Sequence, residues 1–189
     1  MEQKLVTYRE VPTVINNKGI TLIELIIVVS ILSIMTGIVG LSISIVSSAD
    51  TTNTAERIDQ LLERVKSETM SKANSSYLVV YKDLSADNPG YYAGITTSPD
   101  TFVKNTDRDE NIGSLRINIE YVISSSSTKI ENQKIFLTFN RSSGAFEQAQ
   151  IQHASEAPSE IGLISEIKIT GGKAISIMLV SDTGNHYIE

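Results

Sequence analysis

A single carboxylate stands at the entrance of the longest uncharged stretch of the chain, and this arrangement limits the fold more than any other feature. Residues 25–46 contain no Asp, Glu, Lys, Arg or His, and Glu24 directly precedes them. At about 1.5 Å of rise per residue, a helix of this length crosses the hydrocarbon core of a bilayer. A charged side chain at mid-membrane costs about 2.5–3.5 kcal/mol, so Glu24 requires a specific role.

The composition predicts one soluble domain beside the apolar segment. The 189 residues, 41% of them hydrophobic, suffice for one core but hardly for two. Without residues 1–49 the chain carries 13 basic and 19 acidic side chains, and this net charge of −6 repels phosphate backbones. Nucleic acid is therefore not an expected partner. Cysteine is absent, so the fold has no disulfide bonds and thiols do not indicate a redox compartment.

The polar residues 1–19 are expected to stay in the cytoplasm. Three basic side chains outnumber two acidic ones there, and a positive flank keeps that end of an apolar segment inside the cell. The carboxyl-terminal domain is then expected outside. Two ordinary interpretations compete for residues 20–46: a secretory signal cleaved near Ser47-Ser48-Ala49, and a single-pass anchor, which the length favours. Neither interpretation explains Glu24.

The segment Lys18-Gly19-Ile20-Thr21-Leu22-Ile23-Glu24-Leu25 resembles the processing motif of type IV prepilins and type II secretion pseudopilins. The resemblance implies that a membrane-embedded prepilin peptidase cuts between Gly19 and Ile20, removes residues 1–19 as a leader peptide, and methylates the new amine of Ile20. It also implies that Glu24, fifth in the mature chain, directs assembly. The family usually has phenylalanine at the position of Ile20. This departure changes the residue that is methylated but not the expected cleavage and methylation.

Elementary electrostatics supports an assembly role for Glu24. Cleavage before Ile20 creates an amine about four residues, or roughly 6 Å of helix, from the carboxylate. An amine and a carboxylate about 4 Å apart attract by about 4 kcal/mol at an effective dielectric constant near 20, which is comparable to the cost of holding the charge in lipid. We expect Glu24 of one subunit to pair with the Ile20 amine of a neighbour and to set the axial register of a filament of pilin subunits.

The helical pattern continues beyond the apolar run. No proline interrupts residues 20–72, so one helix of about 50 residues is expected. Its residues 20–49 form a transmembrane and filament-core half, and residues 50–73 form an amphipathic half. The hydrogen-bonding side chains of residues 47–53 compete with the helix backbone, so a hinge or a fresh helix cap there is the alternative to one continuous helix. The apolar positions of the second half follow the i, i+3, i+4, i+7 spacing: Ile58, Leu61, Leu62, Val65 and Met70.

Twofold alternation replaces the helical period after Asn74, so residues 74–189 are expected to form a β-rich globular head. Gly171-Gly172 is the strongest hairpin signal. The expected fold class is α+β, in which the long amino-terminal helix packs on a mostly antiparallel sheet, as in pilins. Alternation is clearest at residues 115–123, and shorter runs occur at residues 77–82, 133–140, 163–170 and 173–181.

The later strands resemble those of minor pilins of the FimT type and of the H-type pseudopilin. The resemblance rests on Ile135-Phe136-Leu137-Thr138-Phe139, Gly144, the strand Ile175–Val180 and Gly184. Together with the processing motif it implies a structural subunit of a type IV pilus-like filament, or of a secretion or DNA-uptake pseudopilus. Such a subunit is held in the membrane before assembly and then joins a cell-surface or envelope filament. The alternative is a filament-tip module whose β domain captures a ligand or a surface.

The sequence indicates no catalytic or metal site, and neither an enzyme nor a cofactor is expected. Residues 107–111 look like an oxygen-rich calcium loop, but an EF-hand requires glycine at Ile112 and glutamate at Asn118. A solvated loop is expected there instead. His153 and His186 lie far apart in sequence, match no zinc spacing, and are expected at the surface or in loops. Nucleophile, phosphate-loop and dinucleotide motifs are missing.

Overall fold

The computed structural model describes residues 20–85, 87–105, 107–154 and 156–189, without the side chains of residues 39–44. The chain divides into two compact units, Met1–Gly40 and Leu41–Glu189, and the helix α1 (Leu22–Ser71) contributes to both. The described residues contain one helix and two sheets, and the α+β class is confirmed. The strands are β1 (Tyr77–Asp83), β2 (Gly90–Thr96), β3 (Glu110–Ser114), β4 (Asn118–Ile123), β5 (Ser126–Lys129), β6 (Gln133–Leu137), β7 (Ala149–His153), β8 (Ser159–Gly162), β9 (Glu166–Thr170), β10 (Ala174–Val180) and β11 (Asn185–Ile188).

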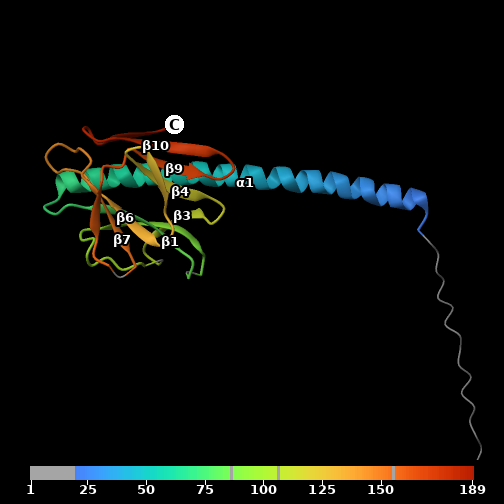
Figure 1. Cartoon of the computed structure of the whole chain (residues 1–189), viewed down its shortest axis with the longest axis horizontal. Coiled ribbons are helices and arrows are strands. Elements are labelled where there is room, and N and C mark those ends of the chain that lie inside the picture. Colours follow the sequence, from blue (N-terminus) through green and yellow to red (C-terminus); the bar gives the residue numbers. More distant parts are fainter. Residues whose placement is uncertain (1–19, 86, 106, 155) are drawn as a thin grey trace, which may run out of the picture. The chain divides into compact units, whose positions relative to one another are not determined.

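The second unit contains both sheets, and we call its β-rich part, residues 74–189, the head. A six-stranded sheet has the order β3-β2-β1-β6-β7-β8, and a five-stranded sheet has the order β11-β10-β9-β4-β5. Each pairing between neighbouring strands is antiparallel, as the sequence predicted. In Figure 1, β10 is seen above the part of α1 that belongs to this unit, and β1, β6 and β7 are seen below it.

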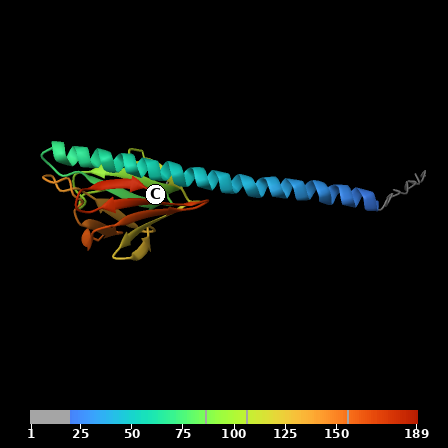
Figure 2. The ribbon, with the colours of Figure 1, turned by 90° about the horizontal axis from the view of Figure 1, so that it is seen from above.

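One hydrophobic core joins this part of α1 to both sheets. Ile58, Leu62 and Val65 are fully buried and belong to one cluster with residues of the two sheets. Figure 2 shows the same part of the helix lying along the strands. In β1, alternate residues such as Leu78 and Val80 point into this cluster, because successive side chains of a strand face opposite sides. The remaining positions of β1 face a smaller aromatic cluster that contains Val79, Tyr81, Tyr92 and Phe136.

The strand boundaries refine the expectations from the sequence. The hairpin at Gly171-Gly172 is confirmed, since Thr170 of β9 pairs with Ala174 of β10. The alternating run of residues 115–123 is only partly a strand, because β4 begins at Asn118. Residues 115–117 form a turn that buries Ile117 and leaves Leu115 exposed, an arrangement that apolar alternation cannot distinguish from a strand.

Residues 47–53, which offered a hinge or a cap, are helical in the structure. The hydroxyl of Thr51 donates to the carbonyl oxygens of Ser47 at 3.0 Å and Ser48 at 2.9 Å. The hydroxyl of Thr52 donates to the carbonyl oxygen of Ser48 at 3.0 Å. These side chains bond to carbonyl oxygens of the helix itself, so they do not divert its main chain into another conformation.

Candidate processing and assembly site

The segment that resembles a processing motif lies at the start of α1. Ile20 and Thr21 precede the helix, and Leu22 is its first residue. Gly19, on the other side of the expected cleavage bond, lies outside the described residues. The side chains of Ile20, Leu22 and Ile23 are exposed.

Thr21 and Glu24 close the first turn of α1 with a reciprocal pair of hydrogen bonds. The main-chain nitrogen of Thr21 donates to Glu24 Oε2 at 3.0 Å, and the Thr21 hydroxyl donates to the same oxygen at 3.0 Å. In return, the main-chain nitrogen of Glu24 donates to Thr21 Oγ1 at 3.2 Å. Threonine at the N-cap and glutamate three residues later form a capping box, which satisfies main-chain N–H groups that a helix start otherwise leaves unpaired.

The capping box gives Glu24 a local role, the stabilisation of the first turn of α1, that its charge alone does not indicate. The signal was present in the sequence, because the pattern Thr-x-x-Glu directly before an apolar run is typical of a capping box. Both bonds from Thr21 reach Oε2, and no described residue donates a hydrogen bond to Oε1. The second carboxylate oxygen is therefore available to a donor from another molecule.

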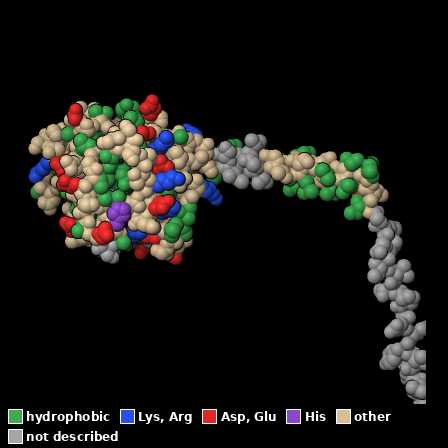
Figure 3. All heavy atoms as spheres, in the orientation of Figure 1, with side chains coloured by type: hydrophobic (Ala, Val, Ile, Leu, Met, Phe, Trp, Pro, Cys, Tyr) green, Lys and Arg blue, Asp and Glu red, His purple; other side chains and the backbone are tan. Residues whose placement is uncertain are grey.

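The polar side chains of the following turns bond within the helix. Ser30 Oγ donates to the carbonyl oxygen of Ile26 at 2.7 Å, Ser33 Oγ to that of Val29 at 2.8 Å, and Thr36 Oγ1 to that of Leu32 at 2.7 Å. The donor of each hydroxyl is therefore satisfied without water or a partner chain. Figure 3 shows hydrophobic side chains gathered on the visible face of this segment.

Within the described part of the chain, which lacks the side chains of residues 39–44, no helix is long and apolar enough to cross a membrane.

The comparisons with known proteins address this same segment. A family model described as the prokaryotic N-terminal methylation motif matches residues 15–40. The chain carries this methylation motif. The match covers the expected cleavage bond, the capping box and the first turns of α1, and it is consistent with type IV pilins and pseudopilins. No curated protein and no solved structure matches the chain. The resemblance of the later strands to FimT-type and H-type proteins stays a prediction.

Beyond the methylation motif, polar residues of α1 connect the helix to the head. Thr54 Oγ1 donates to the carbonyl oxygen of Ile112 at 2.6 Å. Arg57 donates to the Asn111 carbonyl oxygen at 2.8 Å and forms an ion pair with Glu110 at 2.7 Å. Further along α1, the Lys66 ammonium donates to the carbonyl oxygens of Thr183 at 3.3 Å and Gly184 at 3.0 Å. These three side chains anchor the helix to the head.

His186 is not the surface residue that the sequence predicted. It lies on β11, and only 1% of its side chain is exposed, because the strand turns it toward α1. Its Nε2 lies 3.2 Å from the carbonyl oxygen of Asp59, 3.4 Å from the carboxylate of Asp59, and 3.5 Å from that of Glu63. His153, at the end of β7, is exposed. Among the described residues, no group of three or more His, Asp or Glu side chains is arranged to hold a metal ion.

The acidic stretch of residues 107–111 is not simply a solvated loop. Asp109 Oδ2 accepts a hydrogen bond from the Tyr81 hydroxyl at 2.6 Å and another from the main-chain nitrogen of Asn105 at 3.2 Å. Burial, and then the bond to Asp109, raises the pKa of Tyr81. Glu110 is the first residue of β3 and pairs with Arg57. The two carboxylates therefore hold the segment before β3 against the rest of the head.

Proposed function

We propose that the chain is a structural subunit, a minor pilin or pseudopilin, of a type IV pilus-like filament or of a secretion or DNA-uptake pseudopilus. The observation that carries the proposal is the methylation motif, whose match covers residues 15–40 and includes Gly19, Ile20 and Glu24. The role is structural and not catalytic, and its partners are prepilin peptidase, the membrane, and other pilin subunits.

Processing is the first step of this function. Prepilin peptidase cuts after Gly19, residues 1–19 leave as a leader, and the free amine of Ile20 is methylated. The cut converts an internal amide into a cationic amine, and that amine stands four positions before the only carboxylate of residues 20–49. Processing thus creates the cation that Glu24 needs as a partner.

Assembly then depends on Glu24 in two ways. Its Oε2 holds the first turn of α1 through Thr21. Its Oε1 accepts a hydrogen bond from the Ile20 amine of a neighbouring subunit, and this pair sets the axial register of the filament. The two roles are compatible, because an ionised carboxylate has about four lone-pair sites for donors.

The two parts of α1 have different tasks in this proposal. Residues 20–49 reside in the membrane before assembly and in the filament core afterwards, with the amino terminus cytoplasmic and the head outside. Residues 50–73 continue the same helix and pack on the β-rich head of residues 74–189. The internally bonded hydroxyls of Ser30, Ser33 and Thr36 support an apolar surrounding for the first part, since an unpaired hydroxyl buried there is costly.

The amino-terminal residue of the chain taken from the cell envelope tests the proposal. Mass analysis and amino-terminal sequencing are expected to find a methylated Ile20. A terminus at Asp50 would indicate a cleaved secretory signal, and an intact Met1 would indicate a plain anchor. Either of these two outcomes overturns the proposal.

The substitution Glu24→Gln separates the two roles of the carboxylate. Glutamine also completes a capping box, so the helix start is kept while the charge is lost. We expect the variant to be inserted and processed but to enter filaments at least about tenfold less than the wild type, which corresponds to about 1.4 kcal/mol. The matched variant Thr21→Val keeps the charge and removes the hydroxyl of the cap. Wild-type incorporation of Glu24→Gln would refute the proposed pairing with the Ile20 amine.

A further inference from the structure

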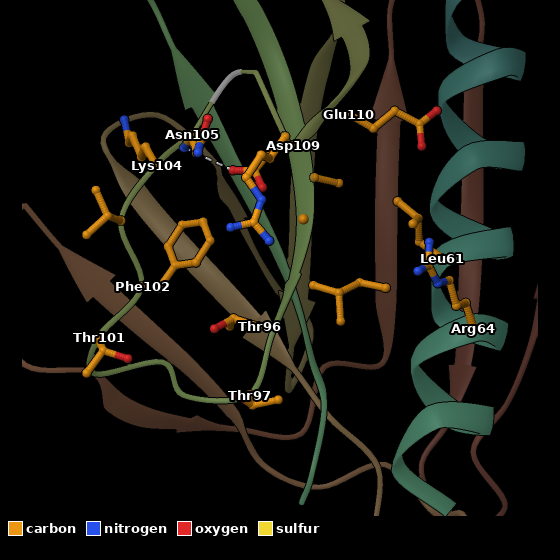
Figure 4. Close-up of a pocket in the computed structure, with 15 residues that line it drawn as sticks. Leu61, Arg64, Thr96, Thr97, Thr101, Phe102, Lys104, Asn105, Asp109 and Glu110 are labelled. Carbon is orange, nitrogen blue, oxygen red and sulfur yellow. Dashed lines mark hydrogen bonds between the residues drawn. The ribbon is translucent and has the colours of Figure 1, made fainter. Parts of the chain in front are cut away.

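The second unit contains a cleft of about 740 Å³ that has no role in filament assembly as proposed above. Its walls are α1 at Leu61 and Arg64, the second half of β2, and residues 101–105 and 108–110. In Figure 4, Leu61 and Arg64 lie on one side and Phe102 on the other, with Thr96 and Thr97 between them. All of these residues belong to the same compact unit.

The floor of the cleft is a strand edge without a partner. β2 pairs with β1 along its whole length, from Gly90 to Thr96. Its register with β3 on the other side ends at Ala93, which pairs with Glu110. Beyond Ala93, no described residue outside β1 forms a hydrogen bond to the main chain of Ile95 or Thr96. An unpaired row of N–H and C=O groups is a template on which a further strand can form.

Helix α1 already satisfies the outer edge of the sheet where β3 is present. Thr54 and Arg57 donate to the carbonyl oxygens of Ile112 and Asn111 in β3. Leu61 and Arg64 come one and two helical turns after Arg57 and line the cleft where β3 has ended. The helix therefore continues to face the position of a strand after the strand itself has stopped.

The side chains around this gap indicate the chemistry of an occupant. Val103, at the rim, is 79% exposed, although it is a large apolar residue. The carboxylates of the lining already have partners within the chain. Asp109 accepts a hydrogen bond from the Tyr81 hydroxyl, and Glu110 forms an ion pair with Arg57.

The lining also contains three cations, of which Lys104 forms an ion pair with Asp83 at 3.6 Å. Among the described residues, Arg64 forms an ion pair only with Glu68, at 3.1 Å, and the guanidinium of Arg108 forms no hydrogen bond or ion pair. Two arginines next to an open strand edge favour a ligand that carries a carboxylate.

We propose that the cleft binds an extended peptide segment with an acidic side chain, which pairs with residues 94–96 of β2 as a short strand in line with β3. At about 3.3 Å per residue, the free edge accepts about three residues of the peptide. Main-chain hydrogen bonds hold the segment, Arg64 and Arg108 bind its carboxylate, and Val103 covers an apolar side chain. This is recognition by strand addition, and it gives the head a binding function beyond its structural role.

Titration of the isotopically labelled full chain in detergent micelles tests the proposal. The probe is the blocked pentapeptide Thr-Val-Asp-Val-Thr, and the readout is the chemical shift of the main-chain amides. We expect saturable shifts at Gly94, Ile95 and Thr96, with a dissociation constant on the order of millimolar, since few groups are engaged. The same peptide with alternate amides N-methylated cannot pair as a strand and is expected not to bind. Absence of shifts, or equal binding of the methylated peptide, overturns the proposal.

Charge variants test the assignment of the cations. Arg64→Gln is expected to weaken binding about two- to fivefold, the range for one exposed ion pair. Arg116→Gln removes the same charge from an exposed arginine outside the cleft and is expected to leave binding unchanged. Equal effects of the two substitutions would show that only net charge matters and would contradict the assigned site. Processing after Gly19 is unaffected in either case, so failure here does not bear on the function as a filament subunit.

Discussion

The apolar side chains of the two parts of α1 have opposite surroundings. Each large apolar side chain from Leu22 to Ile38 is at least 51% exposed in the isolated chain, whereas Ile58, Leu62 and Val65 are fully buried. The polar groups differ in the same way. Hydroxyls of the first part bond to their own helix, and Thr54, Arg57 and Lys66 bond to the head. A single helix thus combines a segment adapted to an external apolar partner with one whose partner is folded from the same chain.

The largest difference between the two parts is expected from leucine truncation. Leu62→Ala should lower the free energy of unfolding of the head by about 2–5 kcal/mol, because it leaves a cavity in a closed core. Leu32→Ala should change that value by less than about 0.5 kcal/mol, as for other exposed sites. Tyrosine fluorescence during denaturation of the full chain in micelles reports the head, since six of the seven tyrosines follow residue 74. Equal losses for the two variants would contradict the comparison.

A smaller difference is expected from a matched pair of threonines. Thr54→Val removes the donor to the Ile112 carbonyl inside the head, and leaving that buried oxygen unpaired should cost about 1–3 kcal/mol. Thr36→Val removes a bond within the first part of α1 and should leave the unfolding of the head unchanged. The same denaturation experiment measures both. If Thr36→Val destabilised the head as much as Thr54→Val, the stated difference between the polar groups of the two parts of α1 would be wrong.

The smallest effect, and a pH-dependent one, is expected near the end of α1. Hydrogen bonding to Lys72, and less so the neighbouring Arg64, lowers the pKa of Glu68 despite partial burial. Its stabilisation is therefore fully present above the unfolded pKa of about 4.3 and is lost as pH falls through the lower folded pKa.

Glu68→Gln should cost about 0.5–1 kcal/mol near pH 7, a range already reduced for solvent screening. The cost should shrink as pH falls through the lowered folded pKa and vanish once both states are protonated. Glu56→Gln, an exposed site on the same helix, is the control. Denaturation midpoints measured from pH 3 to pH 7 test the trend, and a cost independent of pH would exclude the proposed charge effect.

The sequence predicted those elements in which local pattern and final environment agree. β9, β10 and the Gly171-Gly172 hairpin between them were predicted correctly, since buried and less buried residues alternate along both strands. β2 was missed, because its residues Gly90–Gly94 are all buried and show no alternation. Short edge strands such as β5 and β11 carry mainly exposed residues, and hydrophobic patterning gives no signal for them.

The site was predictable to the extent that it is local. The motif around Gly19 and Glu24 is contiguous in sequence. The capping role of Thr21 can also be predicted from four consecutive residues, Thr21 to Glu24. The positions of His186 and Asp109 were not predictable, because each depends on contacts with residues distant in sequence, Asp59 for the histidine and Tyr81 for the aspartate. Tertiary packing decided both.

The capping box at Thr21 and Glu24 also has a consequence for proteolysis. A protease binds the bond that it cuts in an extended conformation, and a bond inside a helix is withheld from it by the helical hydrogen bonds. Because Thr21 is the cap, helical geometry begins only at Leu22, two residues after Ile20. Under the proposed function, the same capping box limits how far the helix extends toward the expected cleavage bond.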